Sequence, residues 1–410
     1  MKRRAYGVSV LLASLAVILA ACSSSSSGGG AAATSKTHGA PVKLLVMYQF
    51  QGDPVAQHPE VGAGAEAAAQ AINAAGGING HPVQIITCDI HDSATQEEAC
   101  AQEAVTDKVT AVAGSLFESG AQSIPVLQKA GIPIIGSLGV YTPEELSNPD
   151  VWPLMGGAVT TYPAIPYLAA KQGLKRIAVV ANPGTGLNEL IQAQASRAGM
   201  TYVGTVSVPL TASDYSSYVE QLKTLNPQII VQVVSTTASA EMMQDGQQLG
   251  LNAIWANQTL NIDVNNLGTF GATANGMYIT SSFPPATAGA QFPGIATFNT
   301  EMDAAGKAGI GNTGIRSAQA VTSWLAVHAI ALVAKGTTGL LTASGLVSAL
   351  HNATTVNVEG LLNWQPNASG PTDFPRVTNS NVYLDKVESG KLVLVSPTPV
   401  NYFKLAGLSS

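Results

Sequence analysis

The chain has 410 residues and a formal net charge of −6, a length typical of two or three domains at about 150 residues each. Only 11% of its residues are charged, whereas 46% are hydrophobic and 6% are aromatic. This composition excludes a charged disordered polymer, and an isoelectric point near 5.5 argues against a nucleic-acid partner.

The first residues have the parts of an export signal. A basic start at residues 1–4 precedes an apolar stretch at residues 7–18, and small residues lead to Cys22. The segment 19–22 resembles a bacterial lipobox, whose cysteine becomes the lipidated first residue of the mature chain. The alternative is an ordinary secretory signal with a cysteine beside its cleavage site.

A run of Ser and Gly at residues 23–30 follows at once and is typical of a flexible tether. We therefore expect a lipoprotein signal peptide at residues 1–21 and a tether at residues 22–41. Lipidation of Cys22 would anchor the protein to the cell membrane on its extracytoplasmic side.

Removal of residues 1–21 leaves 16 Lys and Arg against 25 Asp and Glu, a formal charge of −9. The run at residues 7–21 is the one apolar run that approaches the span of about 20 residues that a membrane helix needs. The next candidate, residues 324–334, is shorter, contains His328 and indicates a buried core helix. We expect the mature chain to be soluble and to contact the membrane through its lipid anchor only.

Two cysteines remain after Cys22, namely Cys88 and Cys100. An exported protein with an even pair favours a disulfide. A metal site formed by these cysteines and His91 is the alternative, but it lacks a fourth ligand and a standard zinc spacing.

From residue 43 onward, short β-branched runs alternate with Ala-rich helical patterns, which indicates βαβ units and a parallel sheet. The predicted strands of the first array span residues 44–50, 82–88, 110–113 and 132–135. The predicted helices between them span residues 61–75, 94–106 and 119–130.

The pattern restarts after a Pro-rich stretch at residues 142–153. The predicted strands of this second array span residues 176–181, 202–208, 228–234 and 276–280, and its helices span residues 187–198, 215–225 and 238–249. Further helices are expected at residues 292–305, 317–334 and 342–350, and hairpin strands at residues 382–386 and 390–395. The fold class is therefore α/β, with two doubly wound parallel-sheet lobes and a ligand cleft between them.

Residues 67–80 read Ala-Ala-Ala-Gln-Ala-Ile-Asn-Ala-Ala-Gly-Gly-Ile-Asn-Gly. This run resembles a stretch of the type I periplasmic solute-binding proteins, in particular the leucine/isoleucine/valine-binding group of the ABC importers for branched-chain amino acids. The likeness continues through residues 88–89, 99–101, 112–115 and 130–136 and is sharpest over residues 42–140. It implies two lobes that are joined by three crossover segments and close on a small ligand.

The late helices would lack a sheet to cover unless the chain returned to the first lobe. We therefore expect lobe 1 to comprise residues 42–157 and 284–357, and lobe 2 to comprise residues 158–283 and 358–400.

The resemblance implies that hydroxyls and backbone N–H groups of lobe 1 hold a ligand carboxylate. The matching positions of this chain are Phe117, Glu118, Ser119, Ser137, Leu138, Gly139 and Tyr141. Glu118 departs from the pattern. A carboxylate at the start of a helix would itself occupy the positive end of the helix dipole, or it would repel a ligand anion.

Lobe 2 of the family supplies an aromatic residue and an acid that holds the ligand ammonium. The matching positions here are Tyr162, Thr185, Ser235, Thr236, Asn257 and Gln258. Thr185 thus replaces the aromatic residue and an amide replaces the acid, and burying an ammonium without a carboxylate costs several kcal/mol. We expect a ligand other than a simple branched-chain amino acid, such as an amide, a urea-like molecule or another small polar or aromatic solute. The alternative is a shifted alignment in which Asp263 serves as the acid.

No phosphate-loop, zinc-protease or nucleophile-elbow motif occurs. The loose dinucleotide pattern that starts at Gly62 lies about ten residues after the first strand, so a tight phosphate turn is absent. We expect no enzyme, no cofactor and no bound metal. The expected function is a lipid-anchored, monomeric solute-binding protein that captures a small polar ligand, such as an amino acid or an amide, for an ABC permease. The alternative is a ligand-sensing lipoprotein that reports to a signalling partner.

Overall fold

The computed structural model describes residues 37–52 and 56–408 of the chain. The expected signal peptide, Cys22 and most of the tether lie outside the described residues. Within the described ranges, no helix is both long enough and apolar enough to cross a membrane.

The first sheet is parallel and has the strand order β2-β1-β3-β4-β5. Its strands are β1 (Val42–Tyr48), β2 (Val83–Asp89), β3 (Ala111–Ala113), β4 (Ile134–Ile135) and β5 (Val151–Trp152). The residues of β1 are mostly apolar and almost all are buried, as expected for a central parallel strand with helices on both faces.

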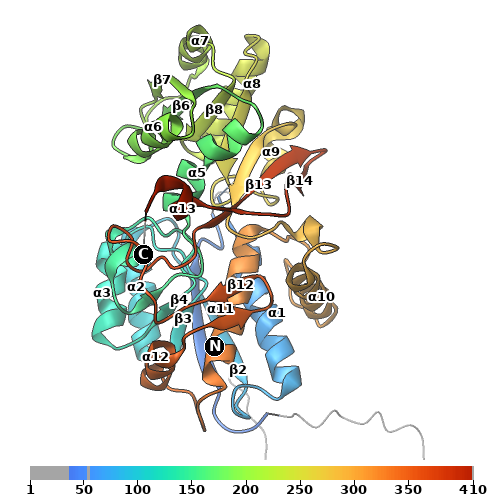
Figure 1. The fold of residues 1–410 in the computed structure, drawn as a ribbon. Helices are drawn as coiled ribbons and strands as arrows, with labels where there is room; N and C mark the ends of the chain where they lie inside the picture. The colour runs from blue at the N-terminus through green and yellow to red at the C-terminus, as the bar shows by residue number, and fades with distance from the viewer. Residues whose placement is uncertain (1–36, 53–55, 409–410) are drawn as a thin grey trace, which may run out of the picture. The chain divides into compact units, whose positions relative to one another are not determined.

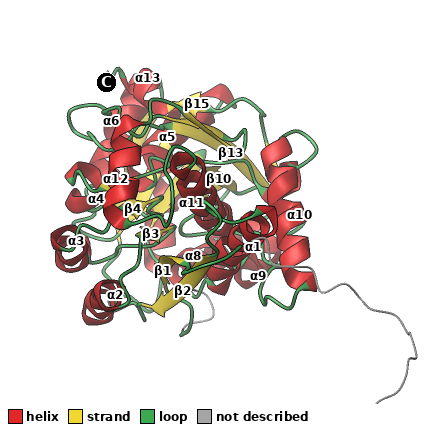
Figure 2. Cartoon of the chain, turned by 90° about the horizontal axis from the view of Figure 1, so that it is seen from below, coloured by secondary structure: helices red, strands yellow, loops and turns green. Residues whose placement is uncertain are grey.

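Helices from two distant parts of the chain cover this sheet (Figures 1 and 2). Those that alternate with its strands are α1 (Pro59–Ala75), α2 (Ala94–Thr106), α3 (Gly120–Lys129) and the short α4 (Pro143–Ser147). The later ones are α10 (Pro293–Lys307), α11 (Ala318–Ala334) and α12 (Ala343–Asn352). Residues of α10, α11 and α12 share one hydrophobic core with β1 and β3, so the chain returns to the first sheet after building the second.

Helices α1 and α11 approach each other closely. A Cβ at Gly64 would lie 2.4 Å from the backbone oxygen of Ala320, so a larger residue cannot fit there. The hydroxyl of Ser323 in turn donates to the backbone oxygen of Val61 at 2.6 Å. Small uncharged residues, which are frequent in this sequence, thus allow these two helices to pack closely.

His328 lies in α11 and is 8% exposed. Its ring nitrogens lie 2.9 Å from Glu301 and 3.3 Å from Glu359. Burial alone would lower the pKa of His328, but hydrogen bonds with these two carboxylates raise it to about 9. The residue that the sequence placed in a core is therefore a charged group held by two acids.

The second sheet has the order β14-β13-β10-β9-β8-β6-β7, with β15 beside β13. Its strands are β6 (Arg176–Ala181), β7 (Thr201–Ser207), β8 (Ile229–Val233), β9 (Ile254–Gln258), β10 (Tyr278–Ser281), β13 (Asn381–Glu388), β14 (Lys391–Leu394) and β15 (Val400–Asn401). The helices that alternate with its strands are α5 (Ala158–Lys171), α6 (Leu187–Arg197), α7 (Ser216–Leu225) and α8 (Thr236–Gln248). The expected class, α/β with two parallel-sheet lobes, is confirmed.

Short elements complete the two lobes. They are α9 (Leu267–Phe270), α13 (Tyr402–Ala406), the 3-10 helices η1 (Gly271–Ala274) and η2 (Ala286–Ala288), and the paired strands β11 (Val356–Val358) and β12 (Leu362–Trp364).

Helix α5 and strand β9 were not expected. Proline at positions 163 and 166 lies inside α5, where it removes helix hydrogen bonds and masks the helical pattern. Burial of every residue from 158 to 169 stabilises this helix in spite of its prolines. Strand β9 ends in two polar residues, Asn257 and Gln258, that no strand pattern favours.

The expected disulfide is present. Cys88 at the end of β2 is bonded to Cys100 in α2, with their Cα atoms 5.7 Å apart. Because both sulfurs are used in this bond, the alternative metal site with His91 is excluded. The part of the chain that the structure describes holds no group of three or more acidic, His or Cys side chains placed to bind a metal ion.

The buried carboxylate of Asp385 in β13 makes stability depend on pH. One oxygen accepts from the Ser281 hydroxyl at 3.0 Å and the other has no partner. Burial raises the pKa of Asp385 to about 8, although the Ser281 hydrogen bond opposes the shift. A raised acid pKa means that the folded state holds the proton more tightly, so the contribution of Asp385 to stability is fully present below about pH 4 and is lost as the pH rises through about 8.

We expect Asp385→Asn to raise the free energy of unfolding by about 1–3 kcal/mol at pH 8.5, because it removes a buried charge and retains the acceptor for Ser281. Near pH 4 the variant and the parent should be equally stable. Urea unfolding at both pH values measures the difference, with the exposed Asp373→Asn as the matched control. An equal effect at both pH values would contradict this reasoning.

Candidate functional site

A cleft of about 670 Å³ lies where residues of both lobes meet, and it is within the range of sites for small organic molecules. Its wall from the first lobe includes Tyr48, Gln49, His58, Leu116, Glu118 and Tyr141. Its wall from the second lobe includes Tyr162, Thr185, Thr236, Gln258, Leu260 and Asn261. Most of these side chains follow the carboxyl ends of parallel strands, where open α/β sheets bind ligands.

Tyr48 and Gln49 stand at the carboxyl end of β1. They are 2% and 9% exposed. The ring of Tyr48 packs edge-on against His58, with 5.1 Å between the ring centroids. His58 precedes α1, so the end of one strand and the start of the next helix form this part of the wall.

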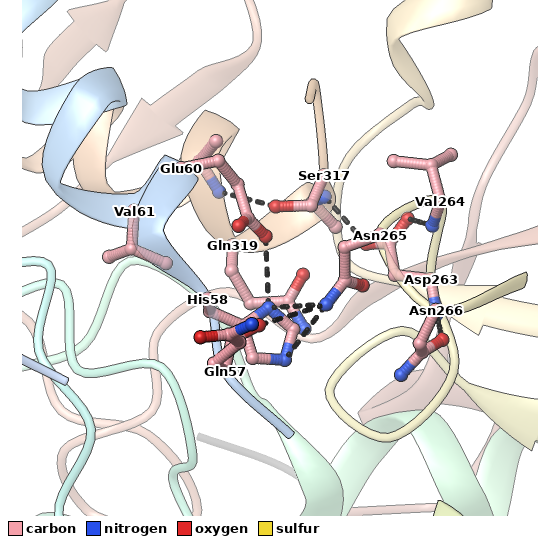
Figure 3. Close-up of polar contacts among 12 residues, drawn as sticks. Gln57, His58, Glu60, Val61, Asp263, Val264, Asn265, Asn266, Ser317 and Gln319 are labelled. Atoms are coloured by element: carbon pink, nitrogen blue, oxygen red, sulfur yellow. Dashed lines mark hydrogen bonds and ion pairs between the residues drawn. The ribbon is translucent and has the colours of Figure 1, made fainter. Parts of the chain in front are cut away.

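His58, in the wall of the cleft, connects the two lobes through its polar contacts (Figure 3). Its Nδ1 atom lies 2.9 Å from a carboxylate oxygen of Glu60, which is fully buried. From the second lobe, the side-chain nitrogen of Asn265 lies 3.2 Å and 3.4 Å from the two ring nitrogens of His58. The same nitrogen lies 3.4 Å from the backbone oxygen of Gln57. The buried histidine is thus a polar contact between lobes at the base of the cleft.

Asp263, the alternative ligand acid, does not line the cleft. Its oxygens accept from the backbone N–H groups of Val264 and Ala318, both at 2.6 Å. The second bond joins the β9–α9 segment to the first turn of α11 (Figure 3). Burial raises the pKa of Asp263 to about 7, although the two backbone bonds oppose the shift. Its position indicates a role in joining the lobes.

The loop after β3 directs two backbone N–H groups toward a carboxylate of the chain itself. Those of Glu118 and Ser119 donate to one oxygen of Glu97 at 2.9 Å and 2.8 Å. The other oxygen of Glu97 accepts from the hydroxyl of Ser123. Glu97 is 1% exposed, so a buried side chain of α2 occupies the amino end of α3.

The loop after β4 repeats this arrangement. The backbone N–H groups of Val140, Tyr141 and Thr142 donate to the carboxylate of Glu145 at 3.0–3.1 Å. Val140 has a φ of 49°, a left-handed conformation that a β-branched residue rarely adopts. The fully buried Glu145 holds this turn closed, and it forms a capping box with Thr142 at the start of α4.

Glu118 itself lines the cleft and is exposed there. The surrounding protein desolvates the carboxylate of Glu118, and this is the main cause that raises its pKa to about 8. A hydrogen bond with the side chain of Asp92 and electrostatic repulsion from Asp92 and Glu97 raise the pKa further. The first lobe therefore offers a carboxyl group at the cleft surface whose charge a ligand can control.

The second-lobe wall carries no charged side chain among the described residues and combines polar with apolar side chains. The hydroxyl of Tyr162 donates to Asn257 at 3.0 Å, and the hydroxyl of Thr236 donates to the backbone oxygen of Asn261 at 2.9 Å. The carbonyl oxygen of Gln258 accepts from the hydroxyl of Thr161, and the side chain of Gln258 also bonds to the hydroxyl of Tyr162. Thr185 is exposed at the cleft surface.

Six of the residues selected from the sequence meet in this cleft: Glu118, Tyr141, Tyr162, Thr185, Thr236 and Gln258. Seven others lie beside it, namely Phe117, Ser119, Ser137, Leu138, Gly139, Ser235 and Asn257. Phe117 and Ser137 are fully buried, and Leu138 lines a separate cavity of about 20 Å³. Ser235 caps α8 by accepting from the N–H of Ala238.

Gly139 and Asn257 support their neighbours in the wall. A Cβ at Gly139 would lie 2.4 Å from the ring of Tyr141, so this glycine leaves room for the ring. Asn257 accepts the Tyr162 hydroxyl from beneath the wall.

Tyr48, Gln49 and His58 line the cleft but were not among the site residues expected from the sequence. A usable signal was present, because Tyr48 and Gln49 end the first predicted strand and the carboxyl ends of parallel strands face the ligand crevice. No pattern of this kind marks Leu260 or Asn261, which reach the cleft through the loop after β9.

A family model described as periplasmic binding protein matches residues 41–391. The chain belongs to the periplasmic binding protein family. This is a family of binding proteins without enzymatic activity, so the expectation of a non-enzyme holds, and the resemblance to type I binding proteins is confirmed. A search of curated protein sequences finds no match.

Solved structures share the fold of this periplasmic binding protein at low sequence identity. An extracellular ligand-binding receptor from Verminephrobacter eiseniae has a TM-score of 0.71 and 15% identity, over 86% of this chain and 100% of that one. A branched-chain amino acid ABC transporter protein from Thermus thermophilus with bound valine has a TM-score of 0.70 and 16% identity, over 89% and 99%. A solute-binding protein of an ABC transporter from Rhodopseudomonas palustris, in complex with 3,4-dihydroxybenzoic acid, has a TM-score of 0.70 and 18% identity, over 88% and 98%.

The bonds to Glu97 predict a specific loss of stability. We expect Glu97→Ala to lower the free energy of unfolding by about 2–6 kcal/mol, because two backbone N–H groups lose a buried partner at about 1–3 kcal/mol each. Glu97→Gln retains an acceptor and should cost much less. Urea unfolding measures both, with the exposed neighbour Glu98→Ala as the control. An equal effect of Glu97→Ala and Glu98→Ala would show that these bonds do not stabilise the loop.

Proposed function

We propose that this periplasmic binding protein captures a small polar ligand outside the cytoplasm and presents it to an ABC permease after its lobes close. The observation that carries the proposal is the cleft of about 670 Å³, whose walls come from both sheets. A ligand that touches both walls binds the closed arrangement more tightly than the open one and shifts the equilibrium toward it. The closed surfaces would then dock on the permease.

The lobes of this mechanism are those expected from the sequence, with crossovers near residues 157 and 283. The proposed third crossover lies after residue 364, because Leu362 and Trp364 pack in the core of the first lobe. The residues proposed to contact the ligand are Tyr48, His58, Glu118, Tyr141, Tyr162, Thr185, Thr236 and Gln258. The solved structures with valine and with 3,4-dihydroxybenzoic acid support a ligand of this size class on the same fold.

Blocking the cleft tests the proposal. A thermal-shift screen of the mature chain against amino acids, amides, ureas and aromatic acids should find a ligand, because a ligand at about 100 times its Kd stabilises the folded state by about 2.7 kcal/mol. Thr185→Trp fills the cleft from an exposed position and should abolish the shift, whereas the exposed Thr224→Trp should retain it.

Small-angle scattering of the parent protein should show a smaller radius of gyration with the ligand than without it. A shift that survives Thr185→Trp, or a ligand that leaves the radius unchanged, would contradict capture by lobe closure.

We also propose that Cys22 anchors the protein. Replacement of this cysteine removes the site of lipidation, so Cys22→Ala should move the protein from the membrane fraction of the producing cells to the extracytoplasmic soluble fraction. Immunoblots of the two fractions measure this, and Ser23→Ala serves as the neighbouring control. An unchanged distribution of Cys22→Ala would disprove the anchor and leave the cleft proposal intact.

A further inference from the structure

We propose that the cleft selects an organic ammonium ion, whose charged head lies against Glu118 and the tyrosine hydroxyls of the first lobe, and that it disfavours a ligand held by a carboxylate. This inference rests on the proposed function and specifies the class of ligand. It follows from which polar groups of the wall are already satisfied and from the charge of the wall.

The backbone groups of the first lobe that suit an anion are already occupied. Five N–H groups converge in its two loops, and all five donate to Glu97 or Glu145. Both carboxylates are buried within the protein. To use these five groups, a ligand carboxylate would have to displace one of the two side chains, which would leave a buried charge without its hydrogen bonds.

The charge of the wall also disfavours an anion. Among the described residues that line the cleft, none is Lys or Arg, and Glu118 is the acid. Glu60 and Asp263 lie behind the wall, close enough to act on the hydroxyl of Tyr48 together with Glu118. Above about pH 8, where Glu118 and Asp263 lose their protons, their combined field attracts a cation into the cleft.

Two polar side chains at the carboxyl end of β1 line the cleft. They are Tyr48 and Gln49, which are 2% and 9% exposed. A ligand in the cleft could therefore contact the hydroxyl of Tyr48 and the side-chain amide of Gln49. A tyrosine hydroxyl and an amide oxygen both accept from an ammonium.

Tyrosine rings complete a seat for a cation. Tyr48, Tyr141 and Tyr162 line the cleft, and the negative face of a tyrosine ring attracts a cation. The organic part of the ligand would contact apolar residues of the wall such as Leu116 and Leu260.

Titration of Glu118 supports the same assignment. Desolvation and the neighbours Asp92 and Glu97 raise its pKa to about 8, and Tyr48 and Tyr141 also face it. The free protein therefore holds a proton on Glu118 at neutral pH. An ammonium competes with that proton, so its affinity should increase as the pH rises through about 8, and binding should release a proton.

Calorimetry with matched probes tests the inference at about pH 8.5. One set is phenethylamine, 3-phenylpropionamide and 3-phenylpropionate, and the other is isoamylamine, 4-methylpentanamide and 4-methylpentanoate. In at least one set the amine should bind about tenfold or more tightly than the amide and the carboxylate. Glu118→Gln should weaken the amine by about tenfold or more and change the amide by less than about twofold, while Glu98→Gln should change neither.

Three outcomes would overturn the inference. They are a carboxylate that binds more tightly than its matched amine, an amine affinity that Glu118→Gln leaves unchanged, and no amine binding in either set. In each case the proposed function would still hold if the thermal-shift screen found a ligand and Thr185→Trp abolished the thermal shift that this ligand causes. Failure of that screen as well would overturn both.

Discussion

Two buried carboxylates organise the first wall of the cleft. In a parallel sheet, the loops after the strands present backbone N–H groups at one edge, and groups of this kind are costly when they are buried without a partner. Here Glu97 receives those of the loop after β3, and Glu145 receives those of the loop after β4. The wall is therefore complete without a ligand, and Glu118 is held at its surface between the two satisfied loops.

The low charge content of the chain affects the protonation of the carboxylates near the cleft. Carboxylates near the cleft face no lysine or arginine among the described residues of its lining, so burial raises their pKa values. Each of these acids is close to a change of protonation near neutral pH. A cleft with such groups responds to the charge of its contents more strongly than a cleft in which salt bridges already fix the charges.

The contact between lobes depends on equally few groups. Asp263 joins the second lobe to the start of α11, and Asn265 joins it to His58. Helix α11 can carry this contact because glycine and alanine let it lie close against α1 and the first sheet. Movement of the lobes would act on these bonds first, since they cross the base of the cleft.

The class of fold, the order of most helices and strands, the disulfide and the family can be predicted from the sequence, because they follow from local periodicity, from spacing and from a run such as residues 67–80. Glu118 and Gln258 can also be predicted, since both stand just after strands or within them at the expected edge. The other features depend on tertiary packing. Helix α5 forms in spite of two prolines because burial outweighs local propensity, and no local pattern shows that α2 sends Glu97 to the start of α3 or that Asp263 holds α11. Those pairings join segments that are distant in the chain, and they depend on how the elements pack around the cleft.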